Sequence, residues 1–410
     1  ENNKYCFIFQ MQPFLTKIKS FIEHLHPSTK GNATKDIDEI IQRLIHIPSK
    51  FKILFISVDG DLHYDAFFKN KFDRLLKLYS ENDISSFFDH FLDLCPLFSS
   101  DFLHIDKNER SILLNNKSIV NPFIKQKTIN SFEINQILNL GDALTDRSNI
   151  GKMRDMYPIQ IFTIRNSLIL LDKYSKESFF YFIVYGMWTE GLLNEEIVPT
   201  TRIFLINTVV HIFITVYKEY SKDLPENVSF KNRPLCRQLF VSINKLYRII
   251  PTLFATSYAL TKYCDGLGID RLTSHPCENR IGNIRCECNG NHSMDNVLLT
   301  TCKHEFLKGT LKQLQIKEER PTRLNLGGCK TCYGSVEFDF VIDYISFAEI
   351  ILKVGFYKTA TDEDENFLFD ILNKFQHEAP FTHASNISVT SNITILNRLY
   401  MTKDVKSDFS

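Results

Sequence analysis

The sequence predicts an α/β core interrupted by a large all-helical domain, and three observations lead to this prediction. A nearly continuous apolar run at residues 51–58 is typical of a strand buried in a parallel or mixed sheet. It is preceded by a strand-like segment at 5–12 and by helical spacing of apolar residues at 14–25 and 36–46. From about residue 111 to 265, strand signals vanish and long stretches of helical periodicity follow.

The remaining elements divide the chain into four parts. The spacing predicts an amphipathic helix at 66–79, a short strand near 95–99, a helix that begins near Asp101, and long helices at 153–173, 177–191, 201–220 and 233–262. The apolar run at 203–216 is too short to cross a bilayer and predicts a buried helix. The expected parts are the first part of the core, the helical insertion, the last part of the core and a tail region, at 1–110, 111–265, 266–315 and 316–410.

Composition limits the function classes only loosely. The 410 residues are enough for two or three domains, and 48 basic side chains balance 48 acidic ones. A net charge of zero argues mildly against DNA binding by the whole chain and leaves a local basic groove open. The sequence shows no secretory signal peptide, so we expect a nuclear or cytoplasmic protein whose ten cysteines are mostly reduced thiols.

The first motif follows the 51–58 strand. Asp59 stands directly after that strand, with Gly60 and Asp61 behind it. A carboxylate at the carboxyl end of a buried strand is typical of metal-binding sites in α/β folds, and Mg²⁺ prefers such oxygen ligands. The alternative is a simple strand-ending turn, which Asp-Gly also favours.

The second motif lies in the segment DFLHIDKNER. Asp101, His104, Lys107 and Arg110 recur at a spacing of three, which gathers them along one stripe of a helix, with Asp101 at the N-cap position. An imidazole and two cations on one stripe suit a phosphate backbone. The alternative is a capped surface helix with solvated charges.

The third motif is the segment LTSHPCENRIGNIR. Pro276 is tolerated in a first helical turn, Glu278 lies in the same turn, and Arg285 follows two turns later on the same face. A carboxylate with a downstream Arg suits a metal beside a phosphate. The alternative is a helix start whose Glu complements the helix dipole.

In this order the three motifs resemble the RNase H-fold DNA transposases of the P-element type and, more loosely, of the hAT type. The resemblance covers roughly residues 5–310, and it implies an RNase H-like core with an all-α insertion. It implies that Asp59 and Glu278 are catalytic ligands of Mg²⁺ or Mn²⁺, with Asp61 as an alternative carboxylate. It further implies a supporting role near the DNA backbone for Asp101, His104, Lys107, Arg110 and Arg285. The implied partners are transposon-end and target DNA and further copies of the chain.

The sequence also departs from the family pattern. Residues 5–12 are similar to the third strand of the RNase H fold, so we expect the first strand, with the first catalytic Asp, to be missing from this chain. The leading hypothesis is therefore a transposase catalytic core that is incomplete or inactive as it stands. The alternatives are a domesticated relative that binds DNA or protein without catalysis, and an unrelated helical scaffold with structural zinc.

A group of thiol and imidazole side chains suggests a possible zinc site. Zinc takes four Cys or His ligands. The candidates lie in two closely spaced groups: Cys286, Cys288, Cys302 and His304, and then Cys329 and Cys332. The alternative is a set of plain buried thiols, because unpaired Cys is a common small core residue.

Overall fold

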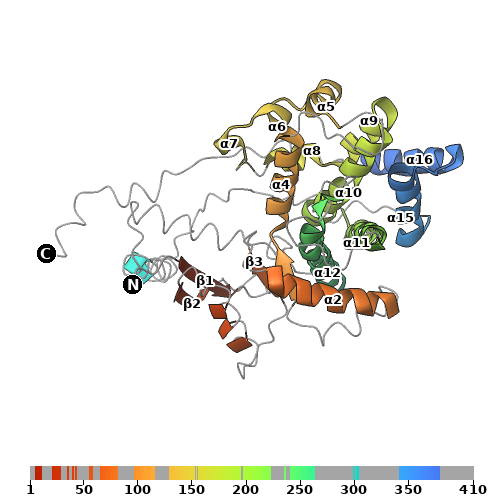
Figure 1. The fold of residues 1–410 in the computed structure, drawn as a ribbon. Coiled ribbons are helices and arrows are strands. Elements are labelled where there is room, and N and C mark those ends of the chain that lie inside the picture. The colour runs from red at the N-terminus through yellow and green to blue at the C-terminus, as the bar shows by residue number, and fades with distance from the viewer. Residues whose placement is uncertain are drawn as a thin grey trace.

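The computed structural model describes about half of the chain, and most of that half is helical (Figure 1). The described residues are 5–11, 21–28, 35–36, 39–40, 42–43, 55–58, 65–81, 97–115, 129–152, 154, 156–194, 197–222, 235–236, 241–263, 299–300, 302–303 and 341–378.

The chain opens with a β-hairpin. Strand β1 (Tyr5–Met11) pairs antiparallel with strand β2 (Phe21–Ser28), with a register irregularity between Phe9 and Gln10. The strand predicted at 5–12 is confirmed. The helix predicted at 14–25 is wrong from Phe21 onward, because pairing with β1 provides backbone hydrogen bonds that the local apolar spacing does not reveal.

A parallel strand pair with a helical crossover follows. Strand β3 (Phe55–Val58) pairs in parallel with strand β4 (Leu97–Ser100), and helix α2 (Asp65–Glu81) lies between them in sequence. Parallel neighbours need such a crossover. All three elements were predicted, and Phe68, Phe72 and Leu75 of α2 are buried as its periodicity indicates.

Helix α4 (Phe102–Asn115) leaves β4 at once and leads into a helical unit (Figure 1). The unit contains α5 (Ser131–Leu138), α6 (Asp142–Thr145), α7 (Asn149–Lys152), α8 (Met156–Ile161), α9 (Ile164–Lys173), α10 (Lys176–Leu193), α11 (Pro199–Lys222) and α12 (Ile243–Tyr263). Most of the described residues between 111 and 265 are helical, as predicted. The helix predicted at 233–262 begins only at Ile243, because strands β5 (Leu235–Cys236) and β6 (Val241–Ser242) pair antiparallel before it.

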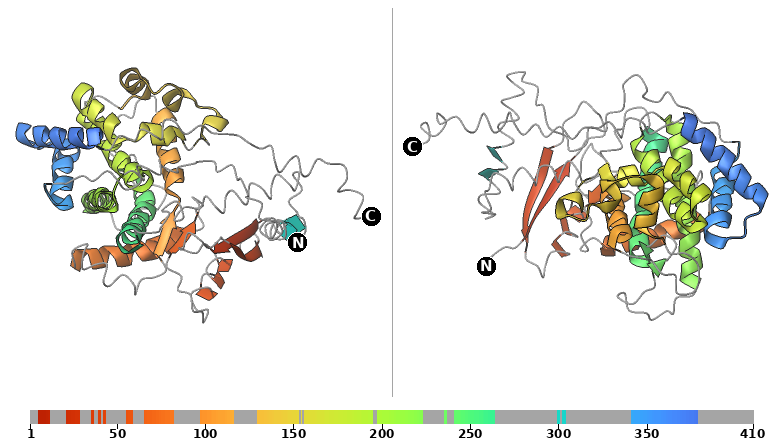
Figure 2. Two further views of the ribbon diagram at one scale, coloured as in Figure 1. Left: turned by 180° about the vertical axis from the view of Figure 1, so that it is seen from behind. Right: turned by 90° about the horizontal axis from the view of Figure 1, so that it is seen from above.

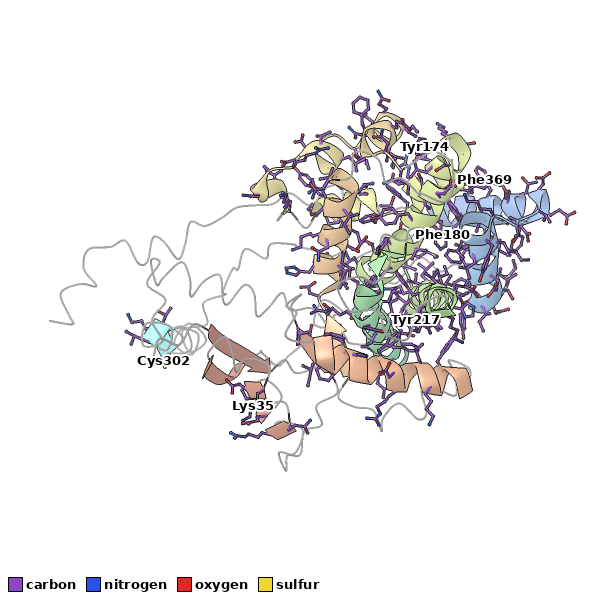
Figure 3. The ribbon with its side chains drawn as sticks, viewed as in Figure 1. Lys35, Tyr174, Phe180, Tyr217, Cys302 and Phe369 are labelled. Carbon is purple, nitrogen blue, oxygen red and sulfur yellow. The ribbon has the colours of Figure 1, made fainter. Side chains whose placement is uncertain are left out.

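The centre of the helical unit is α10. Its side chains from Ser178 to Leu193 are all buried, which explains why the helix is apolar on every face. Helices α9 and α11 pack on it, and α12 packs on α11, α2 and β4. Figure 3 shows Phe180 on α10 inside the helical unit and Tyr217 on α11.

Helix α11 is the one described helix that is long and apolar enough, by length and composition, to cross a membrane. Two thirds (67%) of its apolar window is buried inside the molecule, against α10, α12 and α15. The buried helix predicted for this run is confirmed.

The last described elements belong to the same helical unit. Helix α15 (Tyr344–Leu352) runs through a π-helical turn, η5 (Lys353–Tyr357), toward α16 (Asp362–Glu378). They lie across α10 and α11 from α4 (Figures 1 and 2). The region predicted as a tail therefore contributes helices to the hydrophobic core of the helical unit.

Candidate functional site

The carboxyl ends of the two parallel strands meet at one sheet edge. Val58 pairs with Ser100 in register, and the backbone N–H of Asp101 donates to the Val58 carbonyl at 3.1 Å. The Asp101 Oδ1 atom accepts the Leu103 N–H at 2.9 Å, which is the N-cap interaction predicted from the sequence. Asp101 is buried, so its cap fixes the direction in which α4 leaves the sheet.

Helix α12 supports this edge from the helical unit. The Ser100 N–H donates to Thr252 Oγ1 at 2.8 Å, and the Thr252 hydroxyl donates to the Arg248 carbonyl at 2.7 Å. Ser100 and Thr252 are both buried. The strand end is thus held by a side chain that lies 152 residues further along the chain.

Both predicted catalytic residues, Asp59 and Glu278, lie outside the described residues, as do Asp61 and Arg285. Of the zinc candidates, only Cys302 is described, and its side chain is exposed. It lies apart from the helical unit in Figure 3. Cys286, Cys288, His304, Cys329 and Cys332 are outside the described residues. Within the part of the chain that the structure describes, no three His, Cys, Asp or Glu side chains gather as a metal site.

The four members of the second motif differ in their environment. His104 and Lys107 are half-buried on α4, whereas Arg110 is almost fully buried at 1% exposure. Its guanidinium donates to the carbonyls of Ala143 at 2.8 Å, Gly151 at 3.1 Å and Asp146 at 2.7 Å. Its carbon also lies 4.6 Å from the centre of the Tyr157 ring. A DNA-backbone contact by Arg110 would require these bonds to break, so the structural role of this residue is the one that its contacts support.

Two carboxyl groups on the inward face of α4 were missed by sequence reasoning. Asp106 and Glu109 are buried between α4, α10 and α12. Asp106 Oδ2 accepts the Thr189 hydroxyl at 3.1 Å, and Oδ1 has no hydrogen-bond partner among the described residues. The sequence did contain a signal for their burial, because both positions share a helical face with the apolar Phe102 and Leu113.

Of these two buried carboxyl groups, Glu109 has the more favourable contacts. Its Oε1 accepts from Lys245 Nζ at 3.2 Å, and its Oε2 accepts the Tyr181 hydroxyl at 3.3 Å. Burial raises the pKa of Glu109 to about 7, although the Lys245 charge opposes the shift. Burial also raises the pKa of Asp106 well above its usual range, with the charges of Glu109 and Asp101 adding to the effect.

Another buried carboxyl group, that of Glu190 on α10, contacts the start of helix α9. Its Oε1 accepts the Ile164 N–H at 2.9 Å in the first turn of α9. Burial raises the pKa of Glu190 to about 8, with the Ile164 hydrogen bond opposing it. This carboxyl group ties α10 to the start of α9.

A separate chain of polar contacts joins three helices. The ring of His211 on α11 contacts the Tyr79 hydroxyl of α2 through Nδ1 at 2.9 Å and Glu349 of α15 through Nε2 at 3.2 Å. Burial raises the pKa of Tyr79 above its ordinary value, which disfavours a phenolate nucleophile. The contact chain therefore acts as a polar link between helices.

Comparison with known proteins gives no further guide to this site. No protein-family model, no curated protein and no solved structure matches the chain.

Proposed function

We propose that this chain carries part of the RNase H-like catalytic core of a DNA transposase, with the helical unit as its insertion. The observation that supports the proposal is the parallel β3–α2–β4 unit. Each of its strands is followed in the sequence by an aspartate, and the Val58 carbonyl, which is part of the peptide bond to Asp59, accepts the Asp101 N–H. Ligands in open α/β sheets bind at the carboxyl ends of the strands, which is where this edge lies.

The expected metal is Mg²⁺ or Mn²⁺, which carboxylate oxygens bind well. Asp59 and Glu278 are the residues proposed to hold it. Metal ions held by these carboxylates would supply activation of the attacking oxygen and stabilisation of the leaving one in phosphodiester chemistry. The proposed partners are DNA and further copies of the chain, and a structural zinc site stays a proposal beside them.

Iron-directed cleavage tests the metal site without depending on DNA or on any further ligand. Fe²⁺ bound in place of Mg²⁺ generates hydroxyl radicals when ascorbate and peroxide are added, and these cut the polypeptide beside the metal. We expect cuts near both residue 59 and residue 278, suppressed by excess Mg²⁺. The variants Asp59→Asn and Glu278→Gln should each weaken both cuts, because one metal site is shared.

Matched controls use carboxylates on the exposed faces of two helices. Asp73→Asn on α2 and Glu363→Gln on α16 change the same groups at exposed positions and should leave the pattern unchanged. Cuts at only one of the two segments, or cuts that Mg²⁺ does not suppress, would rule out a shared catalytic metal site.

A second candidate is a domesticated relative that binds DNA or protein without catalysis. The roles of Asp101 and Arg110 favour it, because a helix cap and a set of carbonyl bonds are useful to the fold whether or not catalysis survives. DNA binding in the absence of iron-directed cuts at residues 59 and 278 would support this candidate over the first.

A further inference from the structure

Arg110 of α4 binds the segment that runs from α6 to α8. The guanidinium donates to carbonyls at both ends of residues 143–151. The Tyr157 ring contacts both Arg110 and Arg154, whose guanidinium carbons lie 4.6 and 5.3 Å from the ring centre. Arg154 Nη1 also donates to the Tyr157 hydroxyl at 2.7 Å. These contacts hold a segment of short helices against α4.

Local hydrogen bonds make the segment still more rigid. Ser148 N–H donates to Asp146 Oδ1, and Gly151 N–H donates to Ser148 Oγ, both at 2.9 Å. The carbonyls and the Asp146 carboxylate are thus used inside the segment. The outward side chains are mainly cationic and polar.

Three cations of this segment are exposed: Arg147, Lys152 and Arg154. Among the described residues, none of them lies within ion-pair distance of a carboxylate. The nearby acidic groups among the described residues are Asp142, which is exposed, and Asp146. The Asp146 pKa is lowered mainly by hydrogen bonds with Ser148 and further by the charges of Arg110 and Arg154. Exposed Asn149 adds a hydrogen-bonding side chain between the cations, whereas the Ser148 hydroxyl is used inside the segment.

We infer that these three cations, here called the cationic segment, form a docking surface for the phosphate backbone of DNA. Phosphates are contacted mainly by Arg and Lys, together with polar side chains such as Asn, and the segment presents two Arg, one Lys and the exposed Asn149. Lys107 stands one turn before Arg110 on α4, so a further cation lies along the helix toward the sheet edge. The inference rests on the proposed function, which supplies the DNA partner.

Rigidity is the physical reason for preferring this surface over scattered surface lysines. A side chain on a fixed backbone loses less conformational entropy on binding than one on a mobile loop. Neutralising a phosphate also releases counterions, so each contact should appear in the salt dependence of binding.

Fluorescence anisotropy with a 30-base-pair DNA duplex of arbitrary sequence tests the inference at several salt concentrations. We expect Arg147→Ala/Lys152→Ala to weaken binding about 10-fold and to reduce the salt slope by about 2. The control Arg74→Ala/Lys77→Ala removes the same two charges from exposed positions on α2, at the other end of α4 (Figure 1). It should change the affinity by less than about 2-fold, and both variants should keep the wild-type melting temperature because all four residues are exposed.

Three outcomes would overturn the inference. They are equal losses in the two double variants, no binding of the duplex by the wild-type chain, and competition by polyglutamate as strong as that by DNA at equal charge, which would indicate an acidic protein partner. The proposed metal site is tested separately by the iron cuts at residues 59 and 278. DNA binding through the cationic segment without those cuts would contradict the catalytic proposal alone.

Discussion

Glu109 is a buried carboxyl group whose pKa lies near neutrality. Its side chain has no solvent exposure, and its pKa is raised to about 7 from the ordinary 4.5. The native state therefore keeps a proton that the unfolded chain releases above pH 4.5. The resulting stabilisation is complete below that pH and is lost as the pH rises through about 7. Glu190, raised to about 8, acts in the same direction over a slightly higher range.

We therefore predict that Glu109→Gln makes the free energy of unfolding less dependent on pH. Between pH 5 and pH 8 the wild-type chain should lose stability, and the variant should lose about 2 kcal/mol less, because it has no ionisable group at this position. Urea unfolding at a series of pH values measures the difference. The exposed Glu363→Gln serves as control, and an unchanged pH profile in Glu109→Gln would contradict a raised pKa at this site.

Loss of the Arg110 side chain should destabilise mainly the segment at residues 143–151 that it binds. The variant Arg110→Met keeps a long apolar side chain but leaves the carbonyls of Ala143, Asp146 and Gly151 without their donor. We expect a loss of about 4 kcal/mol in the free energy of unfolding, since each buried unsatisfied group costs about 1–3 kcal/mol.

Limited proteolysis reports where this loss acts. Trypsin should cut the Arg110→Met variant faster at Arg147 and Lys152, because the segment that carries them is no longer held against α4. Arg165→Met, at an exposed position on α9, is the matched control and should change the stability by less than about 0.5 kcal/mol. Equal stability of the two variants would show that the carbonyl contacts contribute little.

At the scale of elements, the approach of α10 to the start of α9 depends on Gly186. A Cβ added there would lie 2.7 Å from the Thr163 carbonyl carbon, closer than real contacts allow. Helix α9 begins at Ile164 and is capped by the Thr163 side chain. The two helices can therefore approach this closely only with glycine at position 186.

We predict that Gly186→Ala lowers the free energy of unfolding by about 2 kcal/mol, despite the better helix propensity of Ala, because backbone atoms must move. Chemical denaturation measures the change. Gln136→Ala, at an exposed position on helix α5, introduces the same side chain without a clash and should be nearly neutral. A neutral or stabilising Gly186→Ala would show that the helices adjust at little cost.

At the scale of the whole molecule, contacts over long sequence distances join the predicted parts. Helix α4 runs through residue 110, where the core and the insertion were expected to meet. His211 links α2 to α15, and ion pairs of Lys176 with Glu365 and of Glu177 with Lys358 link the start of α10 to the last helices. Helices α2, α4, α9 to α12, α15 and α16 therefore contribute to one packed core around α10, to which the parallel strands are attached through α12.

The sequence by itself determined the elements with strong local periodicity. The parallel-strand run ending at Val58, the amphipathic helix α2 and the apolar helices α10 and α11 were all predicted, because burial on one face or on all faces leaves a readable pattern. The cap at Asp101 was predicted for the same reason, since capping depends on neighbours within one turn.

Only the tertiary structure decided how charged residues are used. Arg110 was predicted to lie near the DNA backbone or in solvent, yet its guanidinium binds three carbonyls. The partner of Glu109, Lys245, comes from a helix 136 residues away. The strand at Phe21–Ser28 likewise depends on its partner β1. Burial and pairing are set by segments distant in sequence, so the local pattern of a polar residue does not reveal whether its partner is water or protein.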